Sequence, residues 1–442
     1  MQNLLKMSAA DLGRGIARLD IDPVELTQAY LDAIQSHPQG DHIYARVTHK
    51  RALAEAKAAR RRAQSGDLLS PLDGVPISWK DLFDTAYIAT ESGSALLSQR
   101  IPKRDATVVQ NATQMGLVCL GKTHMSELAF SGLGLNPITA TPPNKNDSKA
   151  VPGGSSSGAA ASVGFDLAAA AIGSDTGGSV RIPAVWNDLV GLKTTSGRLS
   201  LEGVVPLCLK FDTIGPLCRT VEDASLLLGV LEGQLSPTLQ RANIKNSRFA
   251  MLQSVVLDGM RDPPMTAYER AVEKLCEAGA QVDLLDIPDL ESALELSGVL
   301  YGAEANGLWR DVIESAPEKM FREILARFRG GAQYSGADYI SAWRTLEAVR
   351  TTWDKLCTPY DAVLAPTAPN LPPDRDRCYR DHDYHVVENL LGLRNTRVAN
   401  LMELCALTIP TGIPSCGLML MGKPNMEEAL LRQGAAVETL LT

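Results

Sequence analysis

"AIGSDTGGSVRIPA", residues Ala171 to Ala184, is the stretch that decides the fold, because it joins a strand, a glycine turn and a helix. Its apolar start predicts a strand, and Pro183 suits the first turn of a helix. Glycines between the two elements let backbone N–H groups converge on one point, as an anion site or an oxyanion hole requires. Ser179 ends this turn, so it is a nucleophile candidate that lies beside its own charge stabiliser.

A base for this serine is not evident nearby, because no histidine lies close to it in the sequence. A lysine can act as the base if burial lowers its pKa and keeps it neutral. Lys80, in "GVPISWKDLF", ends a predicted apolar strand and follows Trp79. Since most lysines are solvated, this spacing alone makes Lys80 a candidate and no more.

A second stretch of small residues, "VPGGSSSGAAA" from Val151 to Ala161, contains a G-x-S-x-G motif centred on Ser156. This motif is the nucleophile elbow of α/β-hydrolases, and His382, Asp383 and His385 follow downstream as such a triad allows. An elbow follows a hydrophobic strand, however, whereas the polar segment "NKNDSKAVPGG" leads into this one. An esterase that uses Ser156 is therefore kept only as a remote alternative.

Another motif, "GLVCLGKT" from Gly116 to Thr123, matches the phosphate-binding P-loop letter for letter. In a P-loop the four middle residues form a loop between a strand and a helix. Here they are Leu-Val-Cys-Leu, which predict a buried strand, and the preceding segment predicts a helix. We interpret the motif as a strand that ends in a turn.

The rest of the chain alternates between the two kinds of element. Residues 8–36 and "HKRALAEAKAARRRAQSGD" predict helices, and "LAAAAIGS", "VGLKTT" and "DAVLAPT" predict short strands. This mixture indicates an α/β protein. We expect a single domain over residues 1–442, in which a mostly helical segment at about 241–356 forms a subdomain or cap on one face of the sheet.

Composition limits the classes of function. With 45% hydrophobic and 21% charged residues the 442-residue chain is an ordinary globular protein. A net charge of -8 and only 5% aromatic residues argue against direct nucleic-acid binding. The eight cysteines include no C-x-x-C pair, so we expect free thiols and no metal site. The absence of a leader or a long apolar segment favours a cytoplasmic protein without membrane contact.

The stretch from Pro152 to Ser200 resembles the signature of the amidase signature family. "PLDGVPISWKDLFDT", "GKTHMSELAFSG", "FDTIGPLCRTVEDASLLLGVLEG", "YDAVLAPTAPNLPP" and "NTRVANLMELCALTIPTG" resemble further blocks of this family, so the resemblance covers roughly residues 8 to 430. It implies an α/β fold with a central mixed β-sheet covered by helices on both faces. It also explains the P-loop match as a family segment.

The resemblance implies a Ser–cis-Ser–Lys triad, in which Ser179 is the nucleophile, Ser155 the bridging serine in a cis peptide, and Lys80 the base. The oxyanion would be held by backbone N–H groups, and no metal or cofactor would be needed. Substrate contacts are expected from Met125 and Gly154. The residues expected to form the oxyanion hole are Thr176, Gly177, Gly178 and Ser179.

The implied reaction is hydrolysis of a small or medium carboxamide, anilide or carbamate through an acyl-enzyme. The amidase subunit of a tRNA-dependent amidotransferase is the alternative, whereas the intact triad argues against a non-catalytic binding protein. The substrate pocket is expected near residues 125–132, 301–309 and 384–395. The sequence leaves a homodimer open. Four positions depart from the family pattern, of which the last two are expected to affect the pocket or its rim: Ser157, Thr194, Lys210 and Met419.

Overall fold

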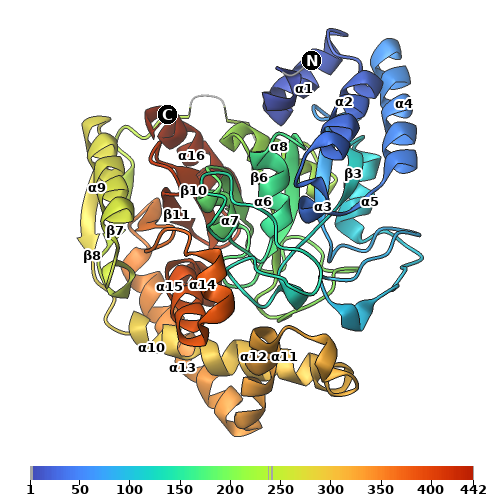
Figure 1. Cartoon of the computed structure of the whole chain (residues 1–442). Helices are drawn as coiled ribbons and strands as arrows, with labels where there is room; N and C mark the ends of the chain where they lie inside the picture. Colours follow the sequence, from blue (N-terminus) through green and yellow to red (C-terminus); the bar gives the residue numbers. More distant parts are fainter. Residues whose placement is uncertain (1–2, 237, 240–241, 442) are drawn as a thin grey trace.

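The computed structural model describes residues 3–236, 238–239 and 242–441 and is built around one mixed sheet of eleven strands (Figure 1). The strand order is β1-β3-β2-β4-β6-β5-β10-β11-β9-β7-β8. Parallel pairs (β2 with β3 and β4) and antiparallel pairs (β4 with β6) both occur, which confirms the predicted mixed sheet. The strands are β1 (Tyr44–Val47), β2 (Pro76–Lys80), β3 (Val118–Thr123), β4 (Ala170–Asp175), β5 (Val190–Lys193), β6 (Thr213–Cys218), β7 (Arg248–Leu252), β8 (Gln281–Leu285), β9 (Ala362–Pro366), β10 (Cys405–Pro410) and β11 (Gly417–Gly422).

Helices pack on this sheet in two rows. In one row α5, α8, α16 and α9 contact each other in turn, and in the other α3, α6, α7 and α15 are linked by contacts. The α-helices are α1 (Ala9–Ala17), α2 (Pro23–Ser36), α3 (Gly40–Ile43), α4 (His49–Ser65), α5 (Thr107–Gln114), α6 (Ser157–Gly164), α7 (Arg181–Trp186), α8 (Val221–Glu232), α9 (Asp262–Glu277), α10 (Leu290–Glu295), α11 (Ser297–Glu314), α12 (Arg322–Gly330), α13 (Gly336–Cys357), α14 (Arg375–Arg380), α15 (His382–Leu401) and α16 (Glu427–Leu441).

Local sequence explains where the N-terminal helices begin and end. The Ser8 side chain caps α1, and Asp22 caps α2, whose first residue is Pro23. Helix α4 stops at Gly66, which adopts a left-handed conformation. The helices expected over residues 8–36 and from His49 are therefore confirmed, with boundaries set by these caps.

The segment at 241–356 contains two strands that the sequence analysis did not predict. Strands β7 and β8 flank α9 and extend the common sheet in parallel, so part of the segment continues the sheet instead of covering it. Helices α10 to α13 follow and lie beside α14 and α15 at the lower side of the molecule in Figure 1. Partly exposed faces on β8 weaken its apolar signal, which explains why it was missed.

The glycine turn at residues 171–184 and the serine-rich stretch at 151–161 lie side by side, because helix α6 packs against β4 and α7. Strand β4 leads into α7 through the glycine turn, and β2 pairs with β4 in parallel. Helix α6 packs closely on this region because it consists of small residues, and a Cβ at Gly158 would come within 2.6 Å of the Ile43 carbonyl oxygen. The eight cysteines are free thiols, as expected. Among the described residues, no helix is long and apolar enough to span a membrane.

Candidate active site

Lys80 ends β2 in the interior, where it contacts two serine hydroxyls. Its Nζ donates hydrogen bonds to Ser155 Oγ and to Ser174 Oγ, both at 2.8 Å. The Gly154–Ser155 peptide bond is cis, as the resemblance implies. The lysine side chain is fully buried. The structure thus brings together the two residues that the family pattern assigns to the proton relay.

The surroundings of Lys80 favour its neutral form. Burial lowers the pKa of Lys80 to about 7, although the charges of Asp212 and Asp175 act in the opposite direction. No carboxylate forms an ion pair with Lys80 among the described residues. Near neutral pH a large fraction of this amine therefore carries a free lone pair, which a general base requires.

Asp175, at the end of β4, anchors the turn that contains Ser179. Its carboxylate accepts hydrogen bonds from the backbone N–H groups of Gly178 and Val180, at 2.8 and 3.1 Å. It also forms an ion pair of 2.9 Å with Arg181, and both side chains are fully buried. Burial raises the pKa of Asp175, but the adjacent Arg181 charge outweighs this and holds the pKa well below its usual range. The turn is therefore fixed by a permanently charged carboxylate.

This anchor corrects the expected oxyanion hole at one position. The N–H of Gly178 is engaged by Asp175, so it does not face the oxyanion. The N–H groups of Thr176, Gly177 and Ser179 donate to no acceptor in the described part of the chain, which leaves them as the candidate donors. Gly178 has a different role: its φ is +136°, and a Cβ there would lie 2.1 Å from Thr396 Oγ1.

Ser156 does not have the surroundings of an elbow nucleophile. No strand leads into it, and its hydroxyl donates to the backbone carbonyl of Ser174 at 3.2 Å. His382 instead contacts Glu323 at 2.6 Å, and His385 contacts the Cys378 carbonyl at 3.2 Å. The remote alternative of an esterase with a Ser156 nucleophile is therefore wrong.

The P-loop lookalike is a strand, as predicted. Lys122 lies within β3, and its buried Nζ bonds Asp81 Oδ1 at 3.2 Å and Thr90 Oγ1 at 2.9 Å. A lysine held in this way cannot reach a phosphate. The described residues also contain no cluster of His, Cys, Asp or Glu that could hold a metal ion.

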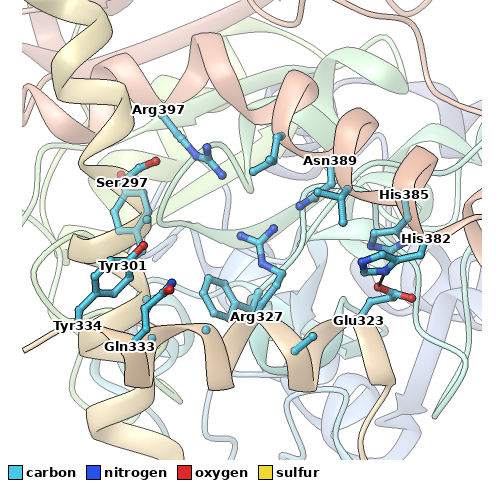
Figure 2. A pocket seen from close by; sticks show the side chains of 18 residues that line it. Ser297, Tyr301, Glu323, Arg327, Gln333, Tyr334, His382, His385, Asn389 and Arg397 are labelled. Atoms are coloured by element: carbon cyan, nitrogen blue, oxygen red, sulfur yellow. Dashed lines mark hydrogen bonds and ion pairs between the residues drawn. The ribbon is translucent and has the colours of Figure 1, made fainter.

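Two adjoining cavities lie beside Ser179. The inner cavity, of about 30 Å³, is lined by Ser179, Thr176 and Gly177 of the turn. The outer cavity, of about 360 Å³, lies among α11, α12 and α15 (Figure 2). Four side chains line both cavities and therefore connect the nucleophile to the larger space: Phe130, Tyr301, Arg327 and Arg397.

The segments expected to form the substrate pocket all reach the two cavities beside Ser179, and their contact with substrate stays a prediction. Each of the ranges 125–132, 301–309 and 384–395 contributes lining residues. Met125 and Gly154 are buried and line neither of the two cavities, so their role in binding stays a prediction. Sequence reasoning missed Ser174, the whole of α12 and Arg397. The available signal for Ser174 was a hydroxyl within the apolar run of β4. No sequence pattern distinguished Arg397, or Arg327 on α12, from a solvated arginine.

The departures from the family pattern leave the cavities intact. Lys210 is exposed and Met419 is buried in β11, where its sulfur accepts a hydrogen bond from Arg181 at 3.2 Å. Neither side chain lines the cavities beside Ser179, so their expected effect on the pocket or its rim stays a prediction. Ser157 begins α6, and the Thr194 hydroxyl donates to the Ile214 carbonyl at 2.8 Å.

Comparison with known proteins agrees with this geometry. The family model described as Amidase matches residues 25–431. A 2-amino-5-chloromuconic acid deaminase of Comamonas testosteroni is 34% identical over 88% of this chain and 87% of its own. A glutamyl-tRNA(Gln) amidotransferase subunit of Chloroflexus aurantiacus is 30% identical over 100% of this chain and 98% of its own. The native peptide amidase of Stenotrophomonas maltophilia superposes with a TM-score of 0.83 at 26% identity, covering 98% and 97% of the two chains.

The chain therefore belongs to the amidase signature family. It is a hydrolase of this family, and amide hydrolysis is the activity that the family and its solved structures support.

Proposed function

We propose that this protein hydrolyses the amide bond of a small substrate through an acyl-enzyme on Ser179. Neutral Lys80 accepts a proton from Ser155, and Ser155 accepts one from Ser179. The Ser179 oxygen attacks the carbonyl carbon, and the N–H groups of the turn stabilise the oxyanion. The proton returns through Ser155 to the leaving nitrogen, and water then hydrolyses the ester.

The contact between Lys80 and Ser155 carries this proposal. A buried lysine that bonds a serine hydroxyl, with no carboxylate partner, has few uses other than proton transfer. Its second partner, Ser174, accepts a hydrogen bond from Nζ, and this bond leaves the single lone pair of the neutral amine free to face Ser155. The backbone N–H of Ser156 donates to the Ser179 carbonyl at 3.2 Å, which holds the two serine loops together.

A free-standing amidase acting on carboxamides, anilides or carbamates is the form we favour. The second candidate function is that of an amidotransferase subunit, which releases ammonia for a partner protein. It is retained because such subunits are similar to this chain over its full length. One relative is named as a 2-amino-5-chloromuconic acid deaminase. Substrates with C–N bonds other than amides therefore belong in the panel of compounds to be tested.

A fluorophosphonate probe tests the nucleophile without knowledge of the substrate. We expect the probe to label the wild-type protein at Ser179, and Ser179→Ala to abolish labelling. Ser155→Ala should slow labelling strongly because the proton path is cut. A label that maps to another residue would contradict the mechanism. L-Glutamine turnover that needs added partner proteins would favour the amidotransferase, whereas turnover of simple amides by the chain alone supports the free-standing amidase.

A further inference from the structure

Two arginines face the cavity beside Ser179 without a carboxylate partner. Arg327 rises from α12 into the middle of the cavity, and Arg397 points down toward it from α15 (Figure 2). Neither guanidinium forms a hydrogen bond or an ion pair to a protein group within the described residues. Arg397 is nevertheless only 9% exposed. Arg327 is partly exposed, but its Nε is buried and has no hydrogen-bond partner among the described residues. A cation removed from water without an acceptor is unfavourable, so these two groups call for a ligand.

The other polar groups around the two arginines are mostly donors. The Tyr301 hydroxyl and Arg327 Nε are buried and have no hydrogen-bond partner among the residues that the structure describes. The Asn389 oxygen accepts from the Gly132 N–H at 2.8 Å, which directs its NH2 group elsewhere, and Figure 2 places this amide at the cavity. An acceptor-rich group would satisfy all of these donors at once.

The two like charges also influence each other. Burial and the nearby Arg397 charge lower the pKa of Arg327 to about 9, so its guanidinium stays cationic at neutral pH. Burial also lowers the pKa of Arg397, but a guanidinium does not lose its proton under ordinary conditions in proteins. The Arg327 guanidinium lies over the Phe130 ring, with its central carbon 4.5 Å from the ring centroid, which fixes its position. An anion between the arginines would relieve their repulsion.

The protein does not supply this anion itself. Glu323 is a carboxylate at the wall of the outer cavity, but it is held by His382 and by Arg322, at 2.6 and 2.8 Å. Figure 2 shows it at the opposite end from Arg397. His385 contributes no charge pairing either, because burial lowers the pKa of its imidazole.

The arginines are close enough to the nucleophile to act on the same small molecule. Both line the inner cavity together with Ser179. A Cβ at Gly177 would lie 3.5 Å from Arg397 Cγ, so the arginine stem touches the turn itself. An inner cavity of about 30 Å³ holds a carboxamide-sized group, and the remainder of a substrate must extend past the two guanidinium groups.

We propose that the substrate is a short amide carrying a carboxylate, and that this carboxylate binds between Arg327 and Arg397 while the amide carbonyl lies at Ser179. The inference rests on the proposed function, since it names the substrate class of that site. Guanidinium groups suit this task because their planar donors match the two oxygens of a carboxylate. Tyr301 and Asn389 complete the donor set around the anion.

Matched pairs of substrates test the charge directly. Monoamides of malonic, succinic and glutaric acid carry a carboxylate where the corresponding diamides carry a neutral group of the same shape. We expect the wild type to prefer at least one monoamide over its diamide by about tenfold or more in kcat/KM. Arg327→Met and Arg397→Met should each reduce kcat/KM for that monoamide by about 30-fold or more, mainly through KM, and change diamide hydrolysis far less. Because both substrates of a pair release a carboxylate at the same carbonyl, the preference reports on the substrate carboxylate and not on the product.

Arg329→Met is the matched control, because Arg329 lies on the same helix but pairs with Glu314 at the surface. It should leave the monoamide preference unchanged. Arg397→Lys, which keeps the charge without the planar fork, should recover part of the preference. Equal kcat/KM for every pair in the wild type, or an equal loss in all arginine variants, would overturn the inference.

Thermal unfolding in the presence of succinate or malonate measures binding at the anion site independently of catalysis. We expect either dicarboxylate to raise the Tm of the wild type by about 2 °C or more at saturation and to leave Arg397→Met unshifted. It should also slow probe labelling of Ser179, whereas succinamide should not. Labelling at Ser179 without any effect of the dicarboxylates overturns the inference and leaves the proposed function standing. A dicarboxylate shift in a protein that is never labelled at Ser179 supports the anion site and contradicts the proposed function.

Discussion

Buried cations have opposite surroundings in two regions of this molecule. Beneath the glycine turn, Arg181 pairs with Asp175 at 2.9 Å and donates to the Thr396 carbonyl at 2.8 Å. In the cavity above the turn, Arg327 and Arg397 have no such partner among the described residues. The first region is satisfied by the protein alone, whereas the second is completed only by something from outside.

The same contrast separates two lysines on neighbouring strands. Lys122 on β3 forms an ion pair with Asp81 at 3.2 Å, whereas Lys80 on β2 donates to the hydroxyls of Ser155 and Ser174 and has no carboxylate partner in the described part of the chain. Removing one member of a buried pair leaves the other charge uncompensated, whereas a cation without a carboxylate is free to lose a proton or to bind a substrate. Partnered cations should therefore affect stability when replaced, and unpartnered ones should affect activity.

Replacement of Lys80 should have the largest effect. We expect Lys80→Met to lower amide hydrolysis by about 10³-fold or more, because the serine relay loses its base. The Tm should not fall greatly, because methionine fills similar space and removes a buried amine. The measurement is kcat/KM on any amide that the wild type hydrolyses, together with the rate of probe labelling.

Lys122→Met is the matched comparison for this variant. It removes the partner of Asp81, so it should lower the Tm while the folded fraction still labels at Ser179. Near-normal activity in Lys80→Met would remove the lysine from the mechanism, and a loss of labelling confined to Lys122→Met would reverse the roles of the two lysines.

Arg181→Met should have the next largest effect, on the free energy of unfolding. It leaves the Asp175 carboxylate buried and unpaired, which costs about 3–5 kcal/mol. Arg397→Met removes an unpaired cation and should leave the free energy of unfolding equal or higher. Chemical denaturation of the two variants measures this difference, and a greater loss of stability in Arg397→Met would show that the cavity arginine is structural.

The sequence located the candidate catalytic residues more fully than the residues that line the cavities beside them, for a physical reason. The glycine turn, the small residues of α6 and the apolar strand before Lys80 are local patterns, and each is imposed by close backbone approach or by burial. Ser179, Ser155 and Lys80 could therefore be placed within a known arrangement. The hydrogen bond from the Gly178 N–H to Asp175 could not be predicted, because it depends on the orientation of a single peptide group.

The cavity is built differently. Arg327 and Arg397 come from separate helices, and what makes them unusual is that no carboxylate of the described residues pairs with either of them, which no local pattern encodes. Strand β8 was missed for a related reason, since a largely exposed strand at a sheet edge has little apolar periodicity. Strand β7 is mostly buried and lies between β9 and β8, so its short apolar run did not by itself distinguish a strand from a helix. Contacts between segments that are distant in the sequence thus account for most of the features that could not be predicted.

The pH dependence of hydrolysis should follow the ionisation of Lys80. Because burial lowers its pKa to about 7, the neutral base is the minor form below this pH and the major form above it. We expect kcat/KM on a neutral amide to rise about tenfold per pH unit below 7 and to reach a plateau near pH 8 to 9. Rates measured from pH 5 to 9 check this, and a plateau reached only near the ordinary lysine pKa would mean that Lys80 is solvated. Asp212, whose pKa burial raises to about 6, faces the same region, so Asp212→Asn shows which group sets the midpoint.

Ser156→Ala should have the smallest effect on the rate of probe labelling. It compares a hydroxyl outside the proton relay with the adjacent Ser155 hydroxyl, which belongs to the relay. The Ser156 hydroxyl donates to the Ser174 carbonyl, so its partner is a backbone group of β4 and not a reacting atom. Its loss should cost about 0.5–1.5 kcal/mol of stability and slow probe labelling by less than about tenfold. Ser155→Ala, one residue away, should slow labelling far more, because that hydroxyl bonds Lys80. Similar rates for the two variants would mean that both hydroxyls only support the loop, and the lysine would then need another route to Ser179.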